Sequence, residues 1–264
     1  MGVMFSVNDG LTDNQKKAAE LMGITNDDMY NRLKRINDKD FYDVSIVIPV
    51  YNGEKYILES INSAKNQTWK STEVIVINDG STDGTHEICK QIDGISYYMK
   101  PNGGTASALN TGIKFAHGLW IKWLSADDVL YPDTVEKMMT YPPLNKEVIY
   151  YTHYDYIDEN GKIKGSFVEP DRSDKSIKEL KEEMLGNFFG NGSTSLIHRD
   201  IFKKIGMFDR LPHSEDYDFW LKALSNGIKM ELMDMYSCKY RLHSEQLTNK
   251  IGGQLNDYIR SRYG

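Results

Sequence analysis

The sequence predicts an α/β fold in which a mostly parallel sheet is flanked by helices. Apolar, β-branched runs such as residues 44–50 (VSIVIPV) and 73–79 (EVIVIND) fit strands that are covered on both faces. Each of these runs is followed by a turn and then by a segment with helical spacing. Such alternation of strand and helix is typical of right-handed βαβ units.

The expected elements can be placed in order along the chain. In the first half, strands at 44–50, 73–79, 95–100 and 119–124 alternate with turn-and-helix segments at 51–67, 80–92 and 102–118. After Pro132 the pattern is less regular. We expect a helix ending near Met139, a strand at 147–157 with a hairpin turn at 158–162, a strand and helix at 195–209, a capped helix at 214–227 and strand material at 229–243.

Residues 1–40 differ from the rest because they are polar and helix-patterned. Thr12 is a candidate cap and Gly23 a candidate stop, which predicts a helical N-terminal extension serving as an appendage or as a contact between copies. A loosely packed arm fits the same pattern equally well. The sequence favours one α/β domain over about 41–264.

Composition excludes several classes of protein. The chain has 264 residues, of which 40% are hydrophobic and 27% charged, and its net charge of -6 gives no general attraction to nucleic acid. Cys89 and Cys238 lie far apart, so neither a disulfide framework nor a zinc site is expected. No signal peptide or membrane span is expected either, and we predict a cytoplasmic protein.

Polar loops follow the predicted strands, where an open parallel sheet gathers its ligands. These loops span Pro49–Glu54, Asn78–Thr85, Lys100–Gly104 and Ser125–Asp128. Asp79 could accept hydrogen bonds from a ligand such as uracil, although the same stretch is also good turn and helix-cap chemistry. Asn102 and Gly103 suit either a plain turn or close approach of the backbone to a phosphate.

Two acidic pairs stand out. Asp127 and Asp128 at the end of the fourth strand could hold Mg²⁺ or Mn²⁺, or form a solvated loop with one carboxylate as a helix cap. Glu215 and Asp216 begin a helix, where one of them could serve as a general base or both could act only as caps. His243 taken alone is more often structural than a metal ligand.

Six motifs in order resemble the family 2 glycosyltransferases, which have the nucleotide-sugar-binding GT-A fold. They are VSIVIPVYNGEKYILESINSAKNQTW, EVIVINDGSTDGT, NGGTASALNTGI, WLSADDVLYPD, SLIHRDIFKKIGMFD and SEDYDFWLKAL, and the similarity covers Val44 to His243. The resemblance implies a nucleotide-binding half at about 41–131 and an acceptor-binding half at about 132–264. It also implies an inverting transfer from a nucleoside diphosphate sugar, with Mn²⁺ or Mg²⁺ as cofactor.

The resemblance further implies roles for individual residues. Asp79 would contact the uracil of a UDP-sugar, Asp127 the ribose and the metal, and Asp128 and His243 the metal. The catalytic base falls at Glu215 or Asp216, with Asp216 preferred. The first-strand motif would line the nucleotide pocket through Pro49, Tyr51, Asn52 and Glu54.

This chain departs from the family pattern at two positions. Ser125 stands where the acidic motif often begins with another aspartate, and Leu109 stands where many members have arginine. Lys100 is therefore a candidate to neutralise phosphate charge. Residues 1–40 have no counterpart in the family pattern.

The expected partners are a UDP-sugar and a glycan or lipid-linked acceptor, with peripheral membrane contact and association of copies through the N-terminal helices as further options. Two other functions remain open from the residues. A sugar-1-phosphate nucleotidyltransferase is disfavoured because the first strand leads into YNGEKY and not into a loop rich in Gly and Arg. A non-catalytic sugar-binding module is the other alternative.

Overall fold

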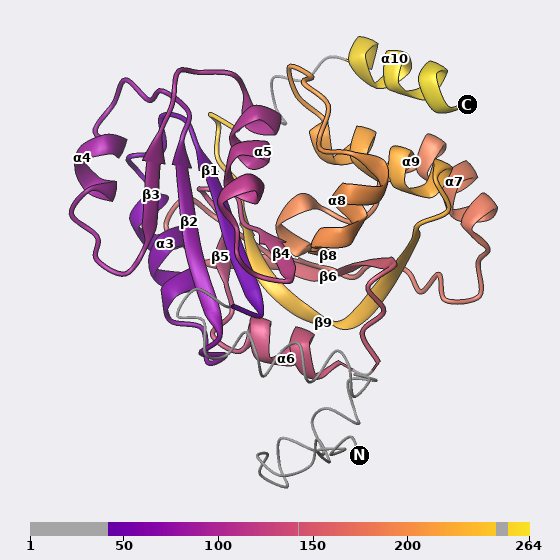
Figure 1. Cartoon of the computed structure of the whole chain (residues 1–264), viewed down its shortest axis with the longest axis horizontal. Helices are drawn as coiled ribbons and strands as arrows, with labels where there is room; N and C mark the ends of the chain where they lie inside the picture. The colour runs from indigo at the N-terminus through magenta and orange to yellow at the C-terminus, as the bar shows by residue number, and fades with distance from the viewer. Residues whose placement is uncertain (1–41, 142, 247–252) are drawn as a thin grey trace, which may run out of the picture.

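The computed structural model describes residues 42–141, 143–246 and 253–264. The predicted N-terminal helices lie outside these residues. Within the described residues, nine strands form one sheet, eight of them in the order β3-β2-β1-β4-β8-β6-β9-β5 and the ninth, β7, paired with β6 (Figure 1).

The first half of the sheet is parallel, as the sequence predicts. β1 (Val44–Val50) pairs with β2 (Thr72–Asn78) and with β4 (Trp120–Trp123), and β2 pairs with β3 (Ser96–Met99). β1 is buried along its whole length, with Val47 packed on one face of the sheet and Ile46 and Ile48 on the other. Apolar residues on both faces explain why this strand reads as a continuous hydrophobic run.

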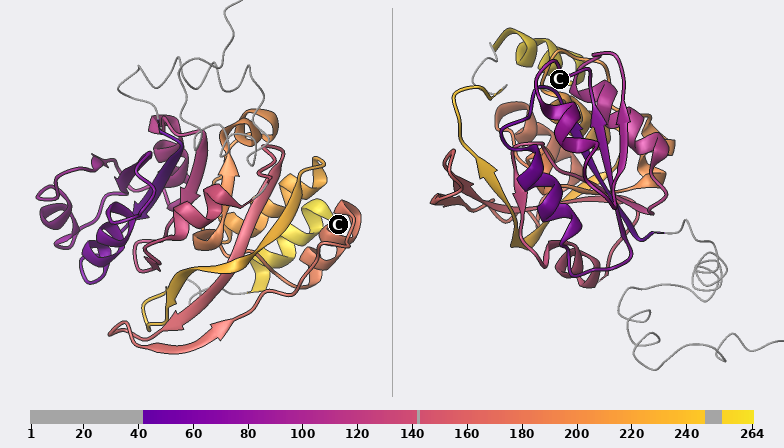
Figure 2. Two further views of the ribbon diagram at one scale, coloured as in Figure 1. Left: turned by 90° about the horizontal axis from the view of Figure 1, so that it is seen from below. Right: turned by 90° about the vertical axis from the view of Figure 1, so that its left-hand side faces the viewer.

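The second half of the sheet is mixed. β6 (Val148–Ile157) pairs over ten residues with β9 (Lys229–Arg241) in parallel, while the antiparallel ladders are only two to four residues long. Those short ladders involve β5 (Val129–Leu130), β7 (Ile163–Phe167) and β8 (Leu196–His198). The far ends of β6, β7 and β9 curl away from the rest of the sheet (Figure 2). The predicted hairpin at 158–162 joins β6 to β7.

Helices cover both faces of the sheet and enclose two hydrophobic clusters. One cluster lies under α5 (Thr105–Phe115) and the helices of the second half, which are α7 (Ile177–Gly186), α8 (Arg199–Ile205), α9 (Glu215–Ser225) and α10 (Gly253–Tyr263). The other lies under α3 (Ile57–Lys65), α4 (Thr85–Cys89) and α6 (Thr134–Thr140). None of the helices in the described residues is both long and apolar enough to cross a bilayer.

A reciprocal amide contact joins α5 to the loop that leads into α9. Asn110 Nδ2 donates to the carbonyl of Phe208 at 2.8 Å, and the backbone N–H of Phe208 donates to Asn110 Oδ1 at 3.0 Å. Both backbone groups of Phe208 are thus satisfied by one side chain. This contact ties the segment that precedes Glu215 and Asp216 to the parallel half of the sheet.

Candidate active site

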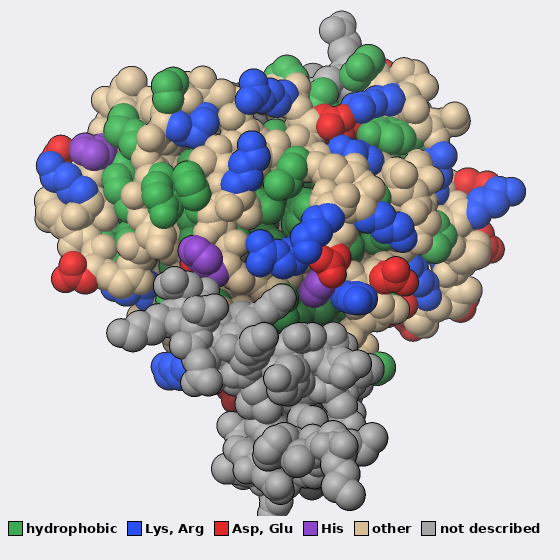
Figure 3. Space-filling view, in the orientation of Figure 1, with side chains coloured by type: hydrophobic (Ala, Val, Ile, Leu, Met, Phe, Trp, Pro, Cys, Tyr) green, Lys and Arg blue, Asp and Glu red, His purple; other side chains and the backbone are tan. Residues whose placement is uncertain are grey.

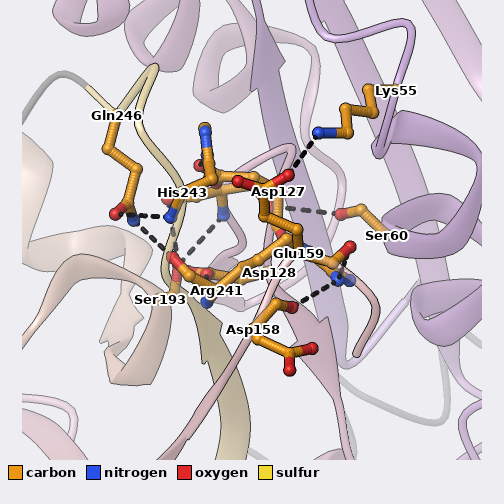
Figure 4. Close-up of polar contacts among 11 residues, drawn as sticks. Lys55, Ser60, Asp127, Asp128, Asp158, Glu159, Ser193, Arg241, His243 and Gln246 are labelled. Carbon is orange, nitrogen blue, oxygen red and sulfur yellow. Dashed lines mark hydrogen bonds and ion pairs between the residues drawn. The ribbon is translucent and has the colours of Figure 1, made fainter. Parts of the chain in front are cut away.

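Asp127 and His243 face each other at the carboxyl edge of the sheet. Asp127 lies in the loop between β4 and β5, and His243 lies just beyond the end of β9. His243 Nε2 is 2.9 Å from Asp127 Oδ2 (Figure 4). The Asp127 side chain is 29% exposed, so its carboxylate can be reached by a ligand. The ends of two strands thus bring together a pair that the sequence separates by 116 positions.

Asp128 turns away from this pair into the protein. It is 1% exposed, and its Oδ1 accepts a hydrogen bond from the backbone N–H of Arg241 at 3.0 Å. Its Oδ2 is buried without a hydrogen-bond partner among the described residues. Burial and the adjacent charge of Asp127 raise the pKa of Asp128 to about 8. The two neighbouring carboxylates therefore have different surroundings.

The donor atoms at this place fit a divalent cation that arrives with a phosphate ligand. No group of three or more His, Cys, Asp or Glu side chains within the described residues forms a metal-binding cluster by itself. The possible metal ligands are the Asp127 carboxylate and the His243 imidazole, together with the buried and unpartnered Oδ2 of the adjacent Asp128. Mg²⁺ is commonly held by one or two carboxylates plus substrate phosphates, and carboxylate ligands suit both Mg²⁺ and Mn²⁺.

Asp79 organises a second loop at the same edge. It follows β2, is 2% exposed, and forms an ion pair with Lys100. Its carboxylate also accepts hydrogen bonds from the backbone N–H of Gly103, at 3.0 and 3.1 Å to its two oxygens, and from that of Gly104 at 2.7 Å. Asp79, Lys100 and Gly103 are thus brought together, as their positions after neighbouring strands predict.

Asn102 is exposed in this loop, and its backbone packs against Gly80. A Cβ atom at Gly80 would lie 2.8 Å from the backbone nitrogen of Asn102, and Gly80 has a φ of +77°. Both the contact and the left-handed backbone require glycine there. The loops that follow β2 and β3 therefore pack directly on each other.

The loop after β1 carries the predicted nucleotide-pocket residues, and it binds mainly to the loop after β2. Asn52 Oδ1 accepts from the backbone N–H of Thr82 at 2.8 Å, and Glu54 Oε2 accepts from that of Gly84 at 2.6 Å. Pro49 is buried within β1, whereas Tyr51 is 53% exposed. Tyr51 is therefore the member of this motif whose side chain is most available to a ligand.

Glu215 and Asp216 lie in the first turn of α9. Ser214, the residue before them, has a φ of +60°, which is an uncommon backbone conformation for serine. Burial raises the pKa of Asp216 to about 6, and backbone hydrogen bonds, including one from Tyr217, offset part of that rise. Burial and the charge of Asp216 raise the pKa of Glu215 to about 7. Carboxyl groups with raised pKa values are suited to exchanging protons near neutral pH.

A short segment lies beside both the Asp127 loop and α9. The 3₁₀ turn η1 (Gly192–Thr194) contacts the first pair's loop, because the backbone N–H of Ser125 donates to Ser193 Oγ at 3.0 Å. Two residues before this turn, the carbonyl of Gly190 accepts a hydrogen bond from Trp220 Nε1 of α9 at 2.7 Å. The segment 190–194 therefore contacts both the Asp127 loop and α9.

Sequence reasoning missed three residues at this site, namely Lys122, Ser193 and Arg241. Lys122 is fully buried, donates to the carbonyls of Ser193 and Trp123, and has its pKa lowered to about 8 by burial. A lysine inside the apolar run WIKWL was a signal that could have identified it. The position of Ser193 depends on contacts between distant segments, whereas Arg241 stands two residues before His243 in an R-x-H segment, which was a signal that could have identified it.

The fold and its loops define a transferase of the GT-A type. The glycosyl transferase family 2 profile matches residues 45–206, which is more than half of the chain. An uncharacterized glycosyltransferase of Rickettsia typhi is 42% identical over 223 residues, covering 81% of this chain and 69% of the relative. The chain therefore belongs to glycosyltransferase family 2 and is an enzyme of that class.

Other relatives are much longer than this chain. The chondroitin synthase of Pasteurella multocida is 32% identical over 208 residues, covering 75% of this chain and 21% of the synthase. The hyaluronan synthase of the same species is 31% identical over 241 residues, covering 88% of this chain and 24% of the synthase. The similarity thus concerns one part of each synthase.

Solved structures share the fold at low sequence identity. Residues 1–349 of Staphylococcus aureus TarS in complex with UDP-GlcNAc superimpose with a TM-score of 0.62 at 19% identity, covering 84% of this chain and 71% of that one. GalNAc-T7 with UDP, GalNAc and Mn²⁺ gives 0.61 at 14% identity, covering 79% and 45%. At this level of identity the likeness establishes the GT-A fold.

Proposed function

We propose that this protein transfers a sugar from a UDP-sugar to a hydroxyl of a glycan or lipid-linked acceptor, with inversion at the anomeric carbon and with Mn²⁺ or Mg²⁺. The observation that carries the proposal is the Asp127–His243 pair at the carboxyl edge of the sheet. Family membership favours glycosyl transfer over nucleotidyl transfer.

Three features support a nucleotide donor. Tyr51 presents an exposed ring at the end of β1, where it can stack on a base. Asp79 holds the 100–104 loop so that Lys100 lies at the same edge. TarS, which shares the fold, has been solved with UDP-GlcNAc.

The diphosphate of such a donor needs local positive charge, because the chain has a net charge of -6. On the face seen in Figure 3, Lys and Arg side chains are spread among acidic and apolar ones. Lys100 lies at this edge, but its ammonium group is already paired with Asp79. Asp127 and His243, with Asp128 behind them, would hold a divalent cation, whose chemistry when bound is to neutralise charge on the departing diphosphate.

The proposed reaction is a single displacement. Asp216 in its ionised form accepts the proton of the acceptor hydroxyl, whose oxygen forms a bond to the anomeric carbon. The bond between that carbon and the diphosphate oxygen breaks, and its electron pair leaves with UDP. Glu215, with its higher pKa, would remain protonated beside Asp216 over part of the neutral range, which favours Asp216 as the base.

The test is release of UDP from a panel of UDP-sugars in the presence of Mn²⁺, followed by NMR determination of the anomeric configuration of the product. We expect turnover that EDTA abolishes and that Asp216→Asn lowers by about 10²- to 10⁴-fold, because a positioned base typically contributes that much. Glu182→Gln is the control, since Glu182 lies exposed on α7 and pairs only loosely with Lys178 at 3.8 Å. Turnover that is unchanged in Asp216→Asn would reject Asp216 as the base.

A further inference from the structure

Arg241 is almost completely buried, yet every nitrogen of its guanidinium group has an acceptor. At the end of β9 it is 1% exposed. Its Nε donates to the carbonyl of Asp127 at 2.8 Å, and its Nη1 donates to the carbonyls of Asp158 and Glu159 at 3.2 Å each (Figure 4). Its Nη2 forms an ion pair with Glu59 on α3. These acceptors come from three separate segments, which are the β4–β5 loop, the β6–β7 turn and α3.

The backbone of Arg241 is equally engaged. Its N–H donates to Asp128 Oδ1 at 3.0 Å, and its carbonyl accepts from the side chain of Gln246. Gln246 Oε1 in turn accepts from the backbone N–H of His243 at 3.2 Å. Both members of the Asp127–His243 pair are therefore connected to Arg241. Asp127 is held through its backbone carbonyl, and His243 is held because it follows Arg241 closely in the chain and shares Gln246 with it.

An aromatic ring completes this arrangement. The guanidinium carbon of Arg241 lies 4.6 Å from the ring centroid of Tyr56, and the His243 ring lies 5.0 Å from the same centroid. The Tyr56 ring thus contacts both residues. A guanidinium on an aromatic face is held in a fixed plane, which a more flexible ammonium would not be.

We propose that Arg241 is a positioning residue that fixes the geometry of the Asp127–His243 pair and thereby sets the affinity of this pair for a divalent cation. This inference rests on the proposed function, which assigns the cation site to that pair. Arg241 also contributes to stability, because its guanidinium donates to backbone carbonyls of two loops, so metal affinity and melting temperature are measured together. Groups that orient metal ligands typically change metal affinity by 10- to 100-fold when they are altered.

The test is Arg241→Lys, which keeps the charge and loses the planar group. Binding of Mn²⁺ in the presence of saturating UDP is followed by the loss of the free Mn²⁺ EPR signal, and binding of UDP without metal is measured separately by calorimetry. We expect the dissociation constant for Mn²⁺ to rise at least 10-fold while that for UDP alone changes less than 2-fold. A Mn²⁺ affinity equal to that of the wild type would overturn the proposal.

Arg172→Lys is the matched control. Arg172 is also buried, at 6% exposure, lies 4.1 Å from the ring centroid of Phe189 and pairs with Glu169 and Glu183. Its partners belong to other segments of the chain than Asp127 and His243, so this change should lower the melting temperature and leave the Mn²⁺ affinity unchanged. An equal loss of Mn²⁺ affinity in both variants would attribute the effect to general loosening and reject a specific role for Arg241.

Glu59→Ala provides a second route if Arg241→Lys does not fold. It removes the carboxylate that pairs with Nη2 and keeps the backbone acceptors of the guanidinium, so we expect a smaller rise in the Mn²⁺ dissociation constant, about 3-fold, and a lower melting temperature. An unchanged constant in this variant would count against the proposal. A wild-type protein that binds no Mn²⁺ with UDP would instead reject the proposed function itself.

Discussion

At the scale of single residues, the site depends on carboxylates that are adjacent in sequence and different in environment. Asp127 is accessible and paired with His243, whereas Asp128 is buried and bonded to the backbone of Arg241. The same division applies to a lesser degree at α9, where Glu215 is more buried than Asp216. Neighbouring acids can therefore be assigned separate tasks, which substitutions can distinguish.

We expect Asp127→Ala and Asp128→Ala both to abolish transfer but only the second to change the stability of the fold markedly. Removal of Asp128 leaves the buried N–H of Arg241 without its acceptor, which costs about 1–3 kcal/mol. It also removes a buried carboxyl whose raised pKa makes its ionised form unfavourable in the fold, so the loss of stability should be largest near about pH 5 and shrink as the pH rises. The Asp127 side chain is partly exposed, so its removal should change the free energy of unfolding by less than about 0.5 kcal/mol. Urea denaturation of the three proteins measures this difference, and equal stability of the two variants would contradict the burial of Asp128.

The pH dependence of kcat/KM should show an acidic limb at about pH 6. Burial raises the pKa of Asp216 above the value near 3.9 of an ordinary aspartate, so its protonated form, which cannot accept a proton, persists to higher pH. Activity should therefore fall as the pH decreases through about 6, instead of through about 4. The position of this limb is expected to within about one pH unit and is checked by measuring kcat/KM between pH 4.5 and pH 8. A flat profile down to pH 4.5 would be inconsistent with Asp216 as the base.

At the scale of elements, η1 packs directly on β4 and beside the Asp127 loop. A Cβ atom at Gly192 would lie 2.5 to 2.8 Å from ring carbons of Trp123, which is too close for either group to stay in place. Trp123 is buried and packs edge-on against Phe208, with 5.7 Å between ring centroids. The turn can therefore lie this close to β4 only because residue 192 has no side chain.

Gly192→Ala should lower stability by about 1–3 kcal/mol, because insertion of a methyl group into a packed site forces its neighbours apart. It should also lower kcat, since the same turn accepts a hydrogen bond from the Asp127 loop through Ser193 Oγ. Thermal unfolding and the UDP-release assay measure the two effects. The matched control is Gly186→Ala on α7, where a Cβ atom would meet nothing within 4 Å. If both variants melt at the same temperature, the close contact with Trp123 is not a constraint.

Much of this architecture could be predicted from sequence because it rests on local pattern. The strands β1 and β2 are mostly apolar runs of seven residues, β4 lies in a shorter one, and turn residues mark where each ends. The order of six motifs also identified the loops of Asp79, Asp127 and Asp216. The two-residue strand β5, the left-handed Ser214 and the burial of Lys122 depend on tertiary packing, and no periodicity in the sequence predicts them.

The orientation of side chains was the least predictable part of the site. Asn52 and Glu54 were expected to line a nucleotide pocket, and the structure has both bonded to the backbone of the 82–84 loop. The sequence pattern can place a residue on a loop. The hydrogen-bond partner of its side chain depends on which loops pack together in the fold. Arg241 illustrates the converse, because it joins three segments that are far apart in the chain.

At the scale of the whole molecule, the proposed donor loops and the helix α9 with its two acids are both built on one sheet. A ligand that bridges these parts should stabilise the entire fold, and a nucleotide present at 100 times its dissociation constant adds about 2.7 kcal/mol. In a thermal-shift screen with Mn²⁺, UDP and UDP-sugars should raise the melting temperature more than GDP or TDP does. A larger shift with GDP would assign the protein to a different donor class.

The most direct test of a cation-dependent diphosphate site is a calorimetric titration of UDP, with and without Mn²⁺, into the wild-type protein and Asp127→Asn. We predict that Mn²⁺ tightens UDP binding to the wild type by at least 10-fold and that Asp127→Asn loses this gain while it still binds UDP without metal. Equal affinity for UDP with and without Mn²⁺ in the wild type would contradict the account.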